Sequence, residues 1–156
     1  MKKLMFAFAA ALALPLQSPA LSQTPAHFDV DQVHPTFGSW SYRPIAGGSE
    51  SAFTDLTGSR RLIVRCIRAN RSVAFVRTGV PAAAPTLSVW TSTLARSVPA
   101  TFQATNELTA MVAATDPLLD AIAFSRGRFA TAAAGTPLLT VPAWPETARV
   151  IEDCRS

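Results

Sequence analysis

Six arginines lie close together in the sequence, and they are the side chains with the clearest capacity for molecular recognition. They fall within 18 residues of one another: Arg60, Arg61, Arg65, Arg68, Arg71 and Arg77. Guanidinium groups bind carboxylates and phosphates through paired N–H donors. The run indicates a surface for an anionic envelope polymer, a lipid phosphate or an acidic protein. The alternative interpretation is a solvated strand face, charged to prevent pairing with other strands.

A metal site has one candidate near the start of the chain. In an extended segment, His27 shares a face with Asp29 and Asp31, while His34, the second of the two histidines, points the other way. These side chains are ordinary ligands of divalent metals. Metal sites are usually held on rigid elements, so we interpret the segment as solvated. We therefore expect no metal and no cofactor.

Signatures of catalysis are few. The sequence has no Gly-x-Ser-x-Gly elbow and no glycine-rich phosphate loop. Glycoside hydrolysis needs two acids that face one cleft. The candidate acids are more simply interpreted as charges at the ends and on the surfaces of helices. They are Asp116, Asp120, Glu146, Glu152 and Asp153. We therefore predict a protein that is not an enzyme.

Aromatic side chains offer a possible carbohydrate-binding face. They are Trp40, Tyr42, Trp90 and Trp144. In a small β domain such residues more often belong to the core or its rim.

The two cysteines, Cys66 and Cys154, are predicted to form one disulfide. Leu62, Val64 and Cys66 share one face of a strand, and Cys154 ends a helical stripe that contains Val150 and Ile151. Both sulfur atoms can therefore point into one core. In an exported protein such a bond persists.

Export is predicted from residues 1–22, which have the form of a signal peptide. Lys2 and Lys3 precede an apolar run of 13 residues, and small residues allow cleavage after Ala20 or Ser22. This run is too short to cross a bilayer, so we do not expect an integral membrane protein. The localisation that follows is periplasmic or secreted. Because both lysines belong to this segment, the formal charge of +4 is no evidence for nucleic-acid binding.

The elements that must position these residues are mostly strands. After a flexible lead-in over residues 23–36, one β-rich domain is expected over residues 37–156. The 156 residues, 49% hydrophobic and 15% charged, suit one folded domain. Alternation and turn residues predict strands at 37–43, 51–56, 60–67, 72–78, 86–91, 102–105, 128–134 and 137–141. Residues 44–49 are predicted as a turn, and residues 107–114 suit a strand or a helix.

Two helices complete the expected fold. Asp116 and Pro117 are typical of a helix start, and a short helix is predicted near residues 116–125. A terminal helix begins at Pro145 and runs to about Cys154. The predicted fold class is mainly β, an antiparallel sandwich or a barrel-like sheet with the terminal helix packed on it.

Three segments in the last third of the chain carry a family resemblance: residues 116–129 (DPLLDAIAFSRGRF), Pro142-Ala143-Trp144-Pro145-Glu146, and residues 149–155 (RVIEDCR). With Phe37-Gly38-Ser39-Trp40, they resemble small exported proteins of unassigned function from sphingomonad-type alphaproteobacteria. The early Phe-Gly-x-Trp strand and the closing helix look, more distantly, like periplasmic proteins of the invasion-associated locus B type. The early cysteine of that type is absent here. The resemblance implies a periplasmic β domain and no functional residue.

These observations lead to three functional hypotheses. The first is a non-enzymatic periplasmic or secreted domain that binds a protein or an anionic envelope component through the arginine-rich hairpin. The second is an inhibitor of a cell-wall hydrolase. The third is a hydrolase whose site has no recognised motif.

Overall fold

The computed structural model describes residues 28–156, and they form one nine-stranded antiparallel sheet with two helices. The predicted signal peptide lies outside the described residues. The order of the strands across the sheet is β1-β2-β3-β4-β7-β6-β5-β8-β9. Their bounds are β1 (Gly38–Ile45), β2 (Gly48–Asp55), β3 (Arg60–Ile67), β4 (Ser72–Thr78), β5 (Thr86–Trp90), β6 (Ala95–Gln103), β7 (Glu107–Ala113), β8 (Arg128–Ala133) and β9 (Leu139–Pro142).

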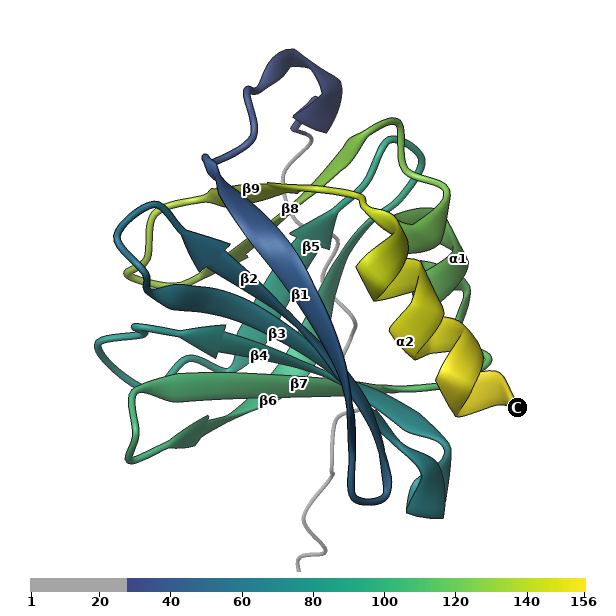
Figure 1. Ribbon diagram of the computed structural model, residues 1–156. Helices are drawn as coiled ribbons and strands as arrows, with labels where there is room; N and C mark the ends of the chain where they lie inside the picture. The colour runs from purple at the N-terminus through teal and green to yellow at the C-terminus, as the bar shows by residue number, and fades with distance from the viewer. Residues whose placement is uncertain (1–27) are drawn as a thin grey trace, which may run out of the picture.

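The sheet curls so that its first and last strands come together (Figure 1). The indole Nε1 of Trp40 donates to the carbonyl oxygen of Pro142 at 2.8 Å. The backbone N–H of Thr36 donates to the carbonyl oxygen of Thr140 at 2.7 Å. The prediction of a mainly antiparallel β fold is therefore confirmed, in its barrel-like form.

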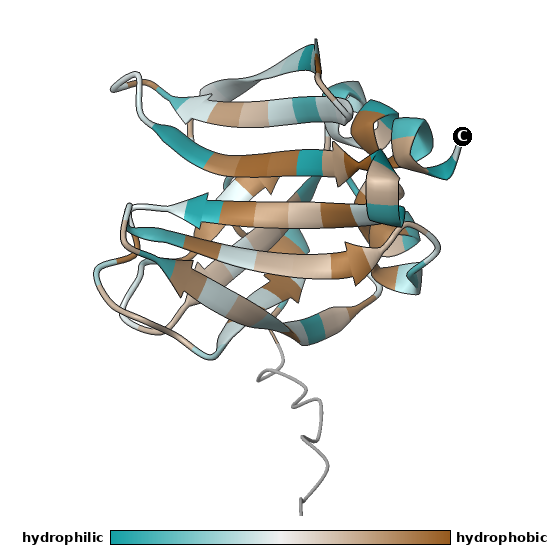
Figure 2. Ribbon diagram, turned by 90° about the horizontal axis from the view of Figure 1, so that it is seen from below, coloured by the Kyte–Doolittle hydropathy of each residue, from teal (hydrophilic) through white to brown (hydrophobic). Residues whose placement is uncertain are grey.

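Both helices lie at one end of the curled sheet and contribute side chains to its apolar cluster (Figure 1). The shorter helix, α1 (Pro117–Ala123), begins where the Asp116 carboxylate accepts the N–H of Leu118. The terminal helix, α2 (Pro145–Arg155), buries the stripe Thr147, Val150, Ile151 and Cys154 against β1, β2 and β3. Apolar residues run along the strands, as the brown segments of Figure 2 show. The largest buried cluster contains the inward residues of the strands together with those of both helices.

The disulfide joins the helix to the sheet. Cys66 on β3 and Cys154 on α2 are bonded, with their Cα atoms 5.2 Å apart and both side chains buried. The prediction from the strand and helix patterns is confirmed.

Residues 28–36 lie against the domain, which corrects the predicted lead-in over this part. Val30, in the short helix η1 (Val30–Gln32), is only 1% exposed, and the Phe28 ring packs edge-on against Trp90. The apolar residues of this segment therefore have partners on the sheet.

The long strand β6 differs most from the sequence-based assignment. We expected a strand at residues 102–105, whereas β6 begins at Ala95 and changes partner along its length. Residues 95–99 pair with β5, and residues 100–103 pair with β7. Pro99 is the last residue of β6 that pairs with β5. Its missing N–H therefore removes no hydrogen bond to β7. The ambiguous segment 107–114 is the strand β7.

No helix among residues 28–156 combines the length and the apolar character needed to cross a membrane.

Candidate functional site

A cluster of charged side chains lies on the outer face of the sheet, and a tight hairpin positions its first two members. Ile45 pairs with Gly48 across a two-residue turn, so Arg43 on β1 lies directly opposite Glu50 on β2. Gly47 in this turn has φ +78°, a conformation that favours glycine. Gly48 approaches β3 so closely that a Cβ atom would lie 2.1 Å from the carbonyl oxygen of Cys66. These two glycines therefore set the register that brings the opposite charges together.

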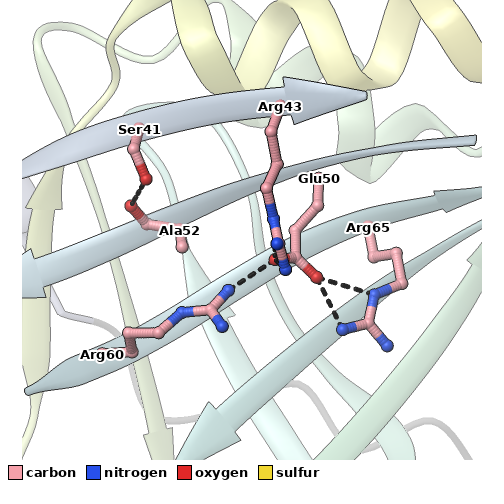
Figure 3. Close-up of polar contacts among 6 residues, drawn as sticks. All are labelled: Ser41, Arg43, Glu50, Ala52, Arg60 and Arg65. Carbon is pink, nitrogen blue, oxygen red and sulfur yellow. Dashed lines mark hydrogen bonds and ion pairs between the residues drawn. The ribbon is translucent and has the colours of Figure 1, made fainter. Parts of the chain in front are cut away.

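Two arginines of β3 complete the cluster around Glu50 (Figure 3). Arg65, directly opposite Glu50, donates from Nε and Nη2 to Oε2 at 2.9 and 2.6 Å. Arg43 donates from Nε and Nη2 to Oε1 at 3.2 and 2.8 Å. Arg60 also donates to Oε1, through Nη2. We call Arg43, Glu50, Arg60 and Arg65 the arginine cluster.

The carboxylate of Glu50 stays ionised although it is buried. Glu50 is only 1% exposed. Burial raises the pKa of a carboxyl group, but hydrogen bonds from Arg65, Arg43 and Arg60 outweigh that effect, and the pKa of Glu50 falls to about 2. Glu50 therefore fixes the three guanidinium groups beside one another at neutral pH.

The arginine cluster carries more positive charge than Glu50 can neutralise. Three guanidinium groups surround one carboxylate, and their side chains remain 62%, 43% and 40% exposed for Arg43, Arg60 and Arg65. Each guanidinium has five N–H donors, and most of these make no bond to Glu50. The arrangement can therefore accept a further anion, with donors already held in place.

The structure divides the six arginines predicted from the sequence among several places. Arg60 and Arg65 belong to the arginine cluster. Arg61 lies 3.8 Å from a carboxylate oxygen of Asp55. Arg68 and Arg71, at the turn between β3 and β4, donate to the carbonyl oxygens of Asp153 and Arg155.

The contacts of Arg68 and Arg71 have a structural explanation. The last carbonyl groups of a helix lack partners within the helix and carry partial negative charge. These two arginines satisfy such groups at the end of α2. They support the helix, and they do not extend the arginine cluster.

Arg77 corrects the predicted surface patch, because its side chain points inward. It pairs across the sheet with Leu62 and Leu108 and is only 1% exposed. Its Nη1 donates to the carbonyl oxygens of Arg61 and Thr78. Burial, together with the positive charge of Arg61, lowers the pKa of Arg77 to about 10.

Arg43 and Glu50 are the two residues of the candidate site that the sequence analysis does not predict. The sequence predicts a turn over residues 44–49, which would separate Arg43 from the strand that carries Glu50. The signal was present in Ala46-Gly47, a two-residue connection typical of a tight hairpin. Recognition of that turn would have placed Arg43 opposite Glu50.

Three of the five acids considered for catalysis hold structural positions. Asp116 caps α1 and also forms an ion pair with Arg96 at 2.9 Å. A hollow of about 340 Å³ lies beside it, and Asp116 is the one acid in its wall. Asp120 and Glu152 pair with Arg155.

The residues considered as metal ligands and set aside have other contacts or lie outside the described part of the chain. Asp29 caps η1, Asp31 accepts a hydrogen bond from the Ser92 hydroxyl, and His27 is outside residues 28–156. Within residues 28–156, no group of three or more His, Cys, Asp or Glu side chains is placed to hold a metal ion.

The four aromatic residues do not form one face. Trp40 is buried between Phe53 and Phe129, and the Tyr42 hydroxyl donates to Asp153. Trp144 is 44% exposed and lines an open, largely apolar hollow of about 700 Å³ beside Phe37. A continuous aromatic platform is therefore absent from the described part of the molecule.

Comparison of the chain with protein-family models, curated proteins and solved structures finds no match.

Proposed function

We propose that this protein is a non-enzymatic periplasmic or secreted domain that binds an anionic partner through the arginine cluster. The observation that carries the proposal is the excess positive charge of that cluster, in which three partly exposed guanidinium groups share one buried carboxylate. Preorganised charge-assisted donors favour carboxylates and phosphates.

Two further features support an exported binding domain. The disulfide between Cys66 and Cys154 is consistent with an oxidising compartment. The N-terminal sequence has the composition of a signal peptide. An acidic envelope protein and an anionic envelope polymer both present the oxygen anions that guanidinium groups recognise.

The experiment is a sedimentation assay of the purified chain with vesicles that contain phosphatidylglycerol, and with neutral vesicles of phosphatidylcholine. The test variant carries Arg43→Gln, Glu50→Gln, Arg60→Gln and Arg65→Gln together. Glu50 is changed as well because an unpaired buried carboxylate would destabilise the fold. The control variant removes two positive charges elsewhere, through Arg126→Gln and Arg149→Gln, and so matches the net charge of the test variant.

The wild-type protein should bind the anionic vesicles at low salt and much less at high salt, because ions screen exposed charges. The test variant should lose most of this binding, whereas the control variant should retain it. Equal binding by the two variants would contradict the proposal, because net charge alone would then explain the result.

A further inference from the structure

A groove of mixed polarity adjoins the arginine cluster on the outer face of the sheet. It has a volume of about 250 Å³; β3, β4 and β7 supply its apolar residues, which are Ile63, Ile67, Ala74, Val76 and Met111, and its polar lining consists of Arg65, Gln103, Glu107 and Thr109. Ile63, Ala74 and Val76 form a nearly buried floor, whereas Met111 is 44% exposed. An outer sheet face is usually polar, so the apolar side of this groove, with Met111 at its surface, departs from the ordinary pattern.

Arg65 belongs to both features. It donates two hydrogen bonds to Glu50 on one side and lines the groove on the other. The register places Arg43, Glu50, Arg65, Ala74 and Met111 in one row across five neighbouring strands. Neighbouring strands lie about 4.8 Å apart, so an anion bound at Arg65 would be within a few ångströms of the groove.

The far end of the groove carries the opposite charge. Glu107 lines it, two strands from β3 and four residues along β7 from Met111. A carboxylate repels a second anion. A ligand with one charged end is therefore oriented with its anion at Arg65 and its apolar part in the groove.

The backbone of the groove favours an alkyl chain over a peptide. Each of β3, β4 and β7 has a hydrogen-bonded neighbour on both sides, so its backbone groups are already paired. A peptide lying there would find few partners for its own N–H and C=O groups, and burial of unpaired polar groups is unfavourable. A saturated chain requires no such partners.

We propose that the outer face binds a single-chain anionic amphiphile, with a phosphate head group at the arginine cluster and the alkyl chain in the groove. The inference rests on the proposed function, since it names the chemistry of the anionic partner. Two positive charges remain after Glu50 is neutralised, which matches the charge of about −1.5 to −2 of a phosphate monoester at neutral pH.

The test is calorimetric titration of the full domain with three probes below any aggregation concentration. They are octyl phosphate, inorganic phosphate and octyl glucoside, which separate the contributions of head group and chain. We expect octyl phosphate to bind about tenfold or more tightly than either other probe, because burial of even a few methylene groups supplies such a factor.

Two pairs of variants assign the contributions. Met111→Gln should weaken the binding of octyl phosphate at least about threefold, because part of the alkyl chain would lose its apolar contact. The binding of inorganic phosphate should not change. Leu138→Gln, at an apolar residue of similar exposure outside the groove, should change neither. Arg65→Gln should weaken both phosphates, whereas Arg126→Gln should not.

Three outcomes would overturn the inference. Octyl phosphate could bind no more tightly than inorganic phosphate, Met111→Gln could behave like Leu138→Gln, or binding could occur only with micelles. In each case the vesicle assay above can still separate the test variant from its control, so a failed inference is distinguishable from a failed function.

Discussion

The chemistry of this protein centres on Glu50, a buried carboxylate whose surroundings would be unfavourable without three arginines. Removal of a carboxylate from water is strongly unfavourable unless charged donors replace the lost solvation. Here both oxygens of Glu50 accept hydrogen bonds from guanidinium groups. The arginines are in turn held in defined positions on an exposed face. The structural ion cluster around Glu50 is therefore also the arrangement that we propose to bind an anion.

The lowered pKa of Glu50 makes a prediction about acid stability. The pKa is about 2 in the folded protein and near its ordinary value of 4.5 in the unfolded chain. A depressed carboxyl pKa stabilises the fold fully above pH 4.5, and this contribution is lost as the pH falls toward 2. The difference in unfolding free energy between wild type and Glu50→Gln should therefore shrink by about 1–2 kcal/mol from pH 5 to pH 2.

Urea denaturation at several pH values measures this difference. Glu152→Gln, a change in a carboxylate whose side chain is 70% exposed, is the control for the loss of one negative charge. A constant gap between wild type and Glu50→Gln over the whole range would be inconsistent with an ionised, arginine-bound carboxylate.

The pattern of residues along β4 explains why the sequence predicts Arg77 on the surface, whereas its side chain points inward. Both faces of β4 are apolar, with Val73 and Phe75 on the inner face and Ala74 and Val76 on the outer face. Alternation alone therefore does not reveal which face Arg77 joins. The neighbouring strands decide it, because Arg77 lies in register with the inward residues Leu62 and Leu108.

At the scale of elements, the hairpins and helices followed from local sequence signals. The strand ranges 60–67 and 72–78 and the start of the terminal helix agree with β3, β4 and α2. The early part of β6 could not be predicted, because residues 95–101 contain Pro99 and no clear alternation. Its conformation comes from pairing with β5 and β7, a tertiary effect that local propensity does not contain.

The disulfide links two elements, and its removal tests how far α2 depends on it. Cys66 and Cys154 are 88 residues apart in the sequence. Closing so long a loop restricts the unfolded chain, so reduction should lower the free energy of unfolding by about 2–4 kcal/mol. Urea denaturation with and without reductant measures the loss.

The double variant Cys66→Ala/Cys154→Ala is the control, and reductant should not change its stability. Mass spectrometry gives an independent check, since the native protein should resist alkylation until it is reduced. Alkylation of both cysteines in unreduced protein would show that the bond is absent.

At the scale of the whole molecule, the two faces of the curled sheet carry different kinds of side chains. The inner face carries the main apolar cluster, to which α1 and α2 contribute, whereas the outer face of β1, β2 and β3 carries the arginine cluster and is not covered by a helix in the described chain (Figure 1). The sequence predicted the inner face through its alternating patterns. It did not predict the site, because Arg43, Glu50 and Arg65 meet only when three strands are in register.

One measurement tests the central claim, that the arginine cluster is a binding site and not only a structural ion cluster. It compares Arg65→Gln and Arg126→Gln, which lose the same charge, in their affinity for phosphatidylglycerol vesicles at fixed salt, with folding checked by circular dichroism. Arg65→Gln removes a guanidinium group of the arginine cluster and should bind more weakly than wild type, whereas Arg126→Gln, outside the cluster, should bind nearly as the wild type does. If the two variants bind equally, the arginine cluster is not the anion-binding site.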